Sequence, residues 1–328
     1  MRKYISLIVC VVLLVIAMVM GRPESSNVTL GAGNGKPETI STAEEFVDVL
    51  DFFESFEFKT SSSAEAGGVT GFATKQDSSE KYTSATFYNK SKGTVNMSQG
   101  GYGANSTFSR ELTIYLTETA AYYKSVGVVM TKSTGEEYKT SLRINFDFEM
   151  YITTNLCLVK FERFDIGATG EGAEDVPSDL FKSSMMRKWI SSEELGEIFM
   201  YVNQENYALL GEIGDYFEDY KFTKFTKNGD VYKINEEFFG DAMDIIFGDI
   251  PAPEDIKGNF VVDLSAKTNP RIKMTMSYSD IFSEVSMSAY EENYISFSNI
   301  NNTVIKFNVD AKNIYHLDDF GINEGDFN

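Results

Sequence analysis

Apolar and polar side chains alternate without a break in the stretch LRINFDFEMYI, from Leu142 to Ile152. Successive side chains of a β-strand point to opposite faces, so this period of two predicts a strand with one apolar and one polar face. Such a strand suits an antiparallel sheet that is packed on one side and wet on the other. A sheet of this kind is therefore the first element that any fold for the chain must contain.

Further strands are predicted on both sides of this stretch, separated by segments rich in Gly, Ser and Asn. They lie at residues 82–88, 112–116, 122–130, 259–264, 271–279, 283–290, 294–298 and 303–309. Short connections between consecutive strands favour antiparallel pairing of neighbours.

The C-terminal stretch YISFSNINNTVIKF, residues 294–307, has an Asn-rich break between two alternating halves. This pattern predicts a closing hairpin of two short strands. We expect the following side chains on its covered face: Ile295, Phe297, Ile305 and Phe307.

Helical periodicity replaces the alternation in three segments, residues 42–55, 195–217 and 236–247. A tight turn at Asn228-Gly229 predicts one more hairpin between the last two of these segments. Strands in two long runs with helices between them predict an α+β fold. We expect a strongly curved antiparallel β-sheet, an open half-barrel, with helices packed on its concave side as a lid.

The N-terminal residues 1–21 begin with basic residues and continue as an apolar run, the pattern of a signal peptide or an N-terminal membrane anchor. Both alternatives stay open. Residues 22–40 predict a flexible linker, residues 41–317 a single domain, and residues 318–328 an acidic tail. We expect an exported protein, secreted or held at the extracellular face of the cytoplasmic membrane through its N-terminal segment only.

The formal net charge of −20 makes a nucleic-acid partner implausible, because the surface repels phosphate. His316 is the only histidine, and Cys157 is the only cysteine after residue 21. One histidine and one cysteine form neither an ordinary zinc set nor a supported catalytic triad, and they exclude an intramolecular disulfide in the exported part. We expect no catalytic residue, no metal, no cofactor and a monomeric protein.

Several features together resemble the LolA, LolB and LppX-type superfamily of lipoprotein and lipid carriers. They are the amphipathic segment TAEEFVDVLDFF near the start, the strand runs, the helical segments in the middle, and a terminal pattern of Tyr294, Phe297, Ser298, Asn301 and Val304. The resemblance covers most of the chain beyond residue 40. It implies a half-barrel whose apolar cavity holds acyl chains.

Two apolar stripes are the candidate ligand site under this interpretation. They comprise Leu142, Ile144, Phe146, Phe148 and Met150 on one side, and Met274, Met276, Tyr278, Val285 and Met287 on the other. Methionine adapts its shape to varied apolar partners, which suits a lipid site, although it fills an irregular core equally well. We expect a non-enzymatic protein that binds a lipid or another apolar small molecule. The alternative is an envelope-associated interaction or sensory domain with a filled core that binds a protein partner.

Overall fold

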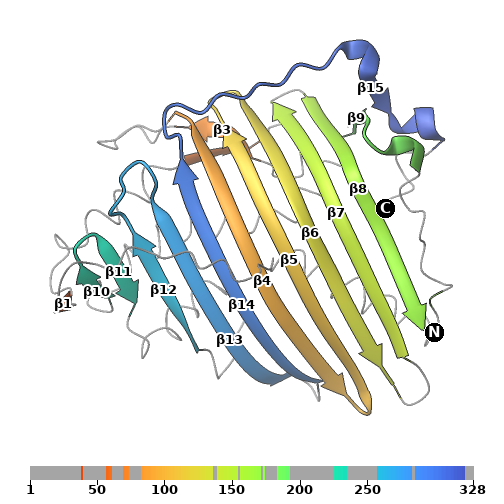
Figure 1. Ribbon diagram of the computed structural model, residues 1–328, viewed down its shortest axis with the longest axis vertical. Coiled ribbons are helices and arrows are strands. Elements are labelled where there is room, and N and C mark those ends of the chain that lie inside the picture. The colour runs from red at the N-terminus through yellow and green to blue at the C-terminus, as the bar shows by residue number, and fades with distance from the viewer. Residues whose placement is uncertain are drawn as a thin grey trace.

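The computed structural model describes 11 parts of the chain. These are residues 38–39, 57–60, 69–73, 83–135, 139–153, 156–170, 173, 183–192, 225–234, 257–282 and 285–321. Thirteen strands of these parts form one open sheet (Figure 1). Its strand order is β1-β10-β11-β12-β13-β14-β4-β5-β6-β7-β8-β9-β15.

The centre of the sheet consists of long antiparallel strands from the two halves of the chain. Five strands of 15 residues follow one another: β4 (Ala85–Gln99), β5 (Tyr102–Leu116), β6 (Ala120–Thr134), β7 (Lys139–Thr153) and β8 (Leu156–Gly170). The C-terminal half adds β12 (Lys257–Asp263), β13 (Arg271–Phe282) and β14 (Val285–Ser298). β14 pairs with β4, so the two runs of strands join in the middle of the sheet.

Short strands complete both sides of this sheet. On one side lie β1 (Glu38–Thr39), β10 (Phe225–Asn228) and β11 (Val231–Ile234); on the other lie β9 (Trp189–Ser191) and β15 (Ile314–His316). The β9–β15 pair is parallel. A separate pair, β2 (Glu57–Thr60) and β3 (Val69–Ala73), brings β3 against β5, β6 and β7.

The predicted α+β half-barrel with a helical lid is wrong for the part of the chain that the structure describes. Strands dominate there, the sheet is open, and no helix reaches seven residues. The helices that do occur are short 3-10 turns such as Ala311–Asn313 and Leu317–Phe320. The segments predicted as helices, residues 42–55, 195–217 and 236–247, lie outside the described residues.

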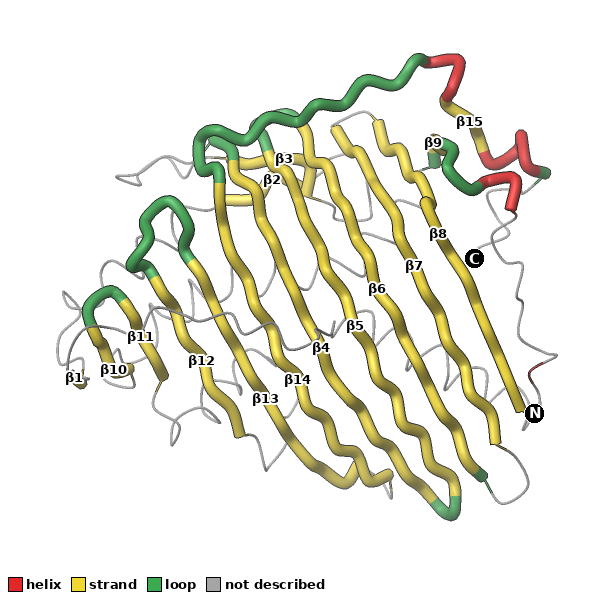
Figure 2. Tube along the Cα trace, viewed as in Figure 1, coloured by secondary structure: helices red, strands yellow, loops and turns green. Residues whose placement is uncertain are grey.

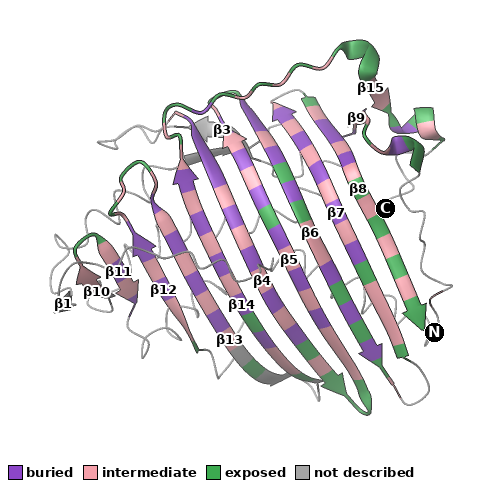
Figure 3. Cartoon of the chain, in the orientation of Figure 1, coloured by how far each residue is buried: buried purple, intermediate pink, exposed green. Residues whose placement is uncertain are grey.

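The two faces of the sheet differ sharply in burial, as Figure 3 shows by the banding along each strand. One face, here the core face, carries the row Phe297, Phe87, Ile114, Tyr123 and Met150, in which each residue pairs with the next. All five side chains are at most 1% exposed. The opposite face, here the outer face, carries charged and hydroxyl side chains that are exposed or half-buried. The alternation in LRINFDFEMYI is confirmed by this division.

Only the first of the two strands predicted for the closing hairpin at residues 294–307 is confirmed. Residues 294–298 are the end of β14, and Ile295 and Phe297 are buried on the core face as expected. Residues 303–310 form no strand; Figure 2 shows them as a loop that crosses the ends of the central strands toward β15. We call these residues the strap.

The strap begins at a polar anchor and is held at its middle by an aromatic contact. Asn301 donates its backbone N–H to the Ser84 carbonyl over 2.7 Å and accepts from the Thr83 N–H over 2.7 Å. The Phe307 ring then stacks on Tyr151 of β7 at 3.9 Å between centroids and meets Trp189 edge-on at 4.9 Å. Phe307 therefore packs on the outer face rather than beside Phe297.

The hairpin predicted around residue 228 is confirmed as β10 and β11. Asn228 pairs with Val231, so the turn consists of Gly229 and Asp230, one residue later than predicted. Gly229 has φ of 59°, a left-handed conformation that glycine adopts without strain.

Candidate functional site

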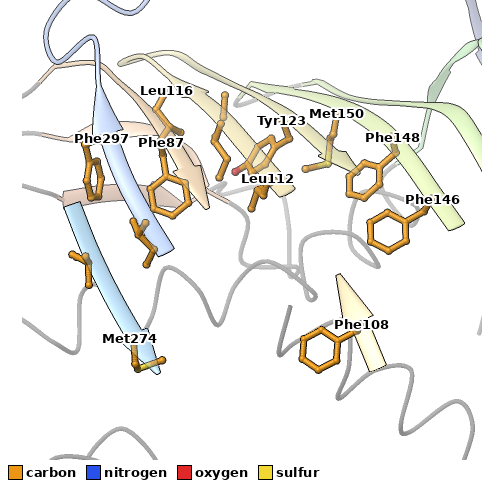
Figure 4. Close-up of a cluster of buried hydrophobic side chains, with 14 of the residues drawn as sticks. Phe87, Phe108, Leu112, Leu116, Tyr123, Phe146, Phe148, Met150, Met274 and Phe297 are labelled. Carbon is orange, nitrogen blue, oxygen red and sulfur yellow. The ribbon is translucent and has the colours of Figure 1, made fainter. Parts of the chain in front are cut away.

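The residues predicted to bind a ligand gather on the core face. Six are buried there: Ile144, Phe146, Phe148, Met150, Met274 and Met276. Leu142 is half-buried, and Met287 packs partly buried against the same cluster. Tyr278 and Val285 lie in β13 and β14, but their side chains are outside the described part of the chain. Figure 4 shows Phe146, Phe148, Met150 and Met274 on the same side of the sheet.

The two predicted stripes do not face each other across a cavity. β13 and β7 are separated by β14, β4, β5 and β6 in the same sheet. With about 4.8 Å between neighbouring strands, the stripes lie roughly 24 Å apart. They are the two apolar flanks of one face, and what lies between them decides what the face can bind.

A group of polar side chains occupies the middle of this apolar face, on β14, β4, β5 and β6. We call it the polar centre, and it consists of Asn89, Ser91, Arg110, Ser125, Glu291 and Asn293. Every member is at most 7% exposed, and Asn89 is at 0%. Register places the row Asn293, Ser91, Arg110 and Gly127 side by side across four strands.

Side-chain amides form a chain of hydrogen bonds within the polar centre. Nδ2 of Asn89 donates to Oδ1 of Asn293 over 2.9 Å, and Nδ2 of Asn293 donates to Oε1 of Glu291 over 2.7 Å. Each amide thus donates in the direction of the Glu291 carboxylate. The Arg110 side chain also interacts with another group of the protein.

Buried atoms of the polar centre without a hydrogen-bond partner in the structure include Oδ1 of Asn89, Oγ of Ser91 and Oγ of Ser125. A buried polar atom without a partner costs about 1–3 kcal/mol. Ser106 and Thr131, on the same face, show the usual arrangement, because their hydroxyls bond each other at 3.0 Å. Single unsatisfied atoms also occur elsewhere in the described sheet, for example at Thr107 and Asn259, whereas the polar centre has several on β4 and β6.

Two aromatic rings flank the polar centre by lying over glycines. A β-carbon built on Gly93 would lie 2.5 Å from Cζ of Phe108, and one built on Gly127 would lie 2.3 Å from Cζ of Phe146. The absence of side chains at these positions lets the rings approach the backbone closely. Phe146, a predicted site residue, is thus fixed beside Arg110, which pairs with Gly127.

The outer face is a network of paired charges. Nζ of Lys92 lies 2.7 Å from a carboxylate oxygen of Glu292. The carboxylate of Glu149 lies 2.9 Å from Nζ of Lys160 and 3.3 Å from Nζ of Lys124. Burial alone would raise the pKa of the Glu149 carboxyl, but a hydrogen bond from Tyr122 and the two lysines hold that pKa below its ordinary value. These ion pairs place charges of opposite sign next to each other on the wet face of the sheet.

His316 and Cys157, the histidine and the cysteine examined above for catalysis and metal binding, both lie in the described part of the chain. His316 is exposed at the end of β15, and Cys157 is a half-buried residue of β8. Within the described ranges, no group of three or more His, Cys, Asp or Glu side chains could hold a metal ion. Among the same residues, none forms a helix long and apolar enough to cross a membrane.

No known family model and no curated protein matches this chain. The resemblance to the lipoprotein and lipid carriers stays a prediction.

Proposed function

We propose that this is a non-enzymatic binding protein that holds an apolar ligand with one polar group, such as a lipid, on the core face of the sheet. The observation that carries the proposal is the polar centre, with its unsatisfied buried atoms between two apolar flanks. A core that only needs to be filled is most stable with apolar side chains in such positions. A ligand with a polar group supplies the missing partners.

The flanks suit the apolar part of such a ligand. Burial of hydrocarbon is worth about 0.8 kcal/mol per CH2 group, so a chain of ten carbons gains several kcal/mol on the face. Met274 and Met276 on one flank adapt to chains of different shape, whereas the aromatic side chains of Phe146 and Phe148 on the other flank give broad contact area. Export through residues 1–21 belongs to the same proposal.

The direct test is whether the purified full-length chain carries lipid. Organic extraction followed by mass spectrometry is expected to release an apolar molecule, and the stripped protein is expected to take up a fluorescent fatty alcohol. Phe146→Asp should abolish uptake by placing a charge on the core face. Val126→Asp is the matched control, because Val126 is 51% exposed on the outer face. Absence of both copurified lipid and uptake would reject the proposal, and uptake by a folded Phe146→Asp protein would remove Phe146 from the site.

A second candidate function is the binding of a protein partner through the edge of β8. Among the described residues, β9 pairs with β8 only at Leu158 and Val159, so residues 165–170 of β8 have no neighbouring strand on that side. An unpaired strand edge is a template for an added strand. Ala168→Pro would block such pairing and leave lipid uptake unchanged, so this variant separates the two functions.

A further inference from the structure

The amide chain in the polar centre has a direction. A carboxylate only accepts hydrogen bonds, so Glu291 requires the Nδ2 group of Asn293. The Oδ1 atom of Asn293 then requires the Nδ2 group of Asn89. The chain therefore ends in an acceptor, Oδ1 of Asn89, which is buried and has no donor.

Two hydroxyls share the core face with this acceptor, and Ser91 is the nearer of them. Ser91 is two residues along β4 from Asn89, so its side chain is on the same face. Ser125 pairs with Leu112, which in turn pairs with Asn89, so it lies two strands away in the same row. Both hydroxyl oxygens are buried without a partner, and each can either donate or accept.

This arrangement selects among polar groups. A carboxylate brings no hydrogen for Oδ1 of Asn89. An ether or an ester carbonyl likewise only accepts. A hydroxyl donates to Oδ1 of Asn89 and can accept from Ser91 at the same time.

We propose that the polar centre binds the hydroxyl group of an uncharged lipid, of the long-chain alcohol, sterol or acylglycerol class, with the hydrocarbon along the apolar flanks. This inference rests on the proposed function and specifies its ligand. Because the acceptor is buried, the core face has to open for the ligand to enter, and uptake is expected to be slow.

The test uses the full-length chain after removal of copurified lipid, with three probes of one chain length: 1-dodecanol, dodecyl methyl ether and dodecanoate. Their affinities are measured by displacement of the fluorescent probe N-phenyl-1-naphthylamine. Dodecanol is expected to bind about tenfold or more tightly than the ether, because only the alcohol supplies a hydrogen to Asn89. In Asn89→Leu the two affinities should become equal, whereas Ser106→Ala should keep the preference.

The outcomes distinguish failure of the hydroxyl site from failure of the proposed lipid-binding function. Equal binding of alcohol and ether, or tighter binding of dodecanoate, overturns the hydroxyl site and leaves the proposed function standing. No displacement by any of the three probes rejects the proposed function itself. An Asn89→Leu protein that keeps the alcohol preference also overturns the site. If this variant fails to fold, Ser91→Ala replaces it, with a reduced preference as the expected result.

Discussion

The ring of Phe146 on β7 lies over Gly127 on β6, with which it pairs directly, and it occupies the space that a side chain at residue 127 would need. The carbonyl oxygen of Ser109 closes the same space from β5, at 2.5 Å from the position of a β-carbon. Gly127 therefore sets both the position of a predicted ligand-binding ring and the flatness of the core face beside Arg110. The glycine is required for close approach and not for an unusual backbone angle.

Gly127→Ala is expected to lower the free energy of unfolding by about 1–3 kcal/mol, because both the ring and a backbone oxygen have to shift. Urea denaturation measures the change. Gly167→Ala is the matched control, since its β-carbon would meet only the Arg143 carbonyl oxygen at 3.9 Å, an ordinary contact. A Gly127→Ala protein as stable as Gly167→Ala would show that the ring is not held in this way.

The strap provides a second test of the outer face. Phe307→Ala removes the ring that stacks on Tyr151 and meets Trp189, so the strap should loosen at its middle and the protein should lose about 1–3 kcal/mol of stability. Trp189 is the only tryptophan of the chain, so tryptophan fluorescence reports on the surroundings of this one indole. Its emission should shift to longer wavelength as the indole becomes more exposed.

Val304→Ala is the control for this prediction, because Val304 belongs to the same strap and is 69% exposed. Its emission spectrum should match that of the unaltered protein. Identical spectra for Phe307→Ala and the unaltered protein would contradict the packing of Phe307 against Trp189.

The charge network around Glu149 predicts how stability depends on pH. The pKa of Glu149 in the folded protein lies below its ordinary value, despite burial, because Tyr122, Lys160 and Lys124 favour the carboxylate. The stabilising contribution is therefore present above the unfolded-state pKa of about 4.3, and it is lost as the pH falls below that value. Glu149→Gln should destabilise the protein at pH 7 and have a smaller effect at pH 3.5.

Urea titrations of both proteins at the two pH values test this sign. Glu111→Gln is the comparison, because Glu111 pairs with Lys90 on the same face but is 52% exposed, where ion pairs contribute little. If Glu149→Gln lowered stability equally at both pH values, the carboxylate would not be the group that titrates.

The sequence predicted some features of this fold well because alternation alone determines them. The faces of Ile144, Phe146 and Phe148 follow directly from a period of two, whatever the neighbouring strands are. The lengths of the strands do not follow in this way. The stretches GANSTFS and DIGATG have compositions typical of loops, yet they pair with β6 and β7 as parts of β5 and β8, because strand formation depends on neighbours as much as on composition.

The polar centre was missed for a related reason. Asn89 and Ser91 occur in the segment NKSKG, whose composition is typical of a turn, although they share the parity of Phe87 and so point to the core face. Polar residues at apolar positions of an alternating strand were the signal that could have located them. Phe307 was misplaced because alternation in the strap mimics a strand, and the sequence does not reveal that the strap has no strand partner among the described residues.

The polar centre also makes a prediction about stability that is independent of any ligand. Ser125 has a buried hydroxyl without a partner, so Ser125→Ala is expected to leave stability unchanged or to raise it by up to about 1 kcal/mol in the ligand-free protein. Ser106→Ala, on the neighbouring strand of the same face, should instead cost about 1–2 kcal/mol, because it leaves the Thr131 hydroxyl unpaired. Thermal unfolding of both variants after removal of lipid measures the contrast. Equal losses would mean that Ser125 is satisfied in solution, and the polar centre would then be ordinary packing. The predicted asymmetry would identify a residue that is retained at the expense of stability, as expected of a binding site rather than of a core.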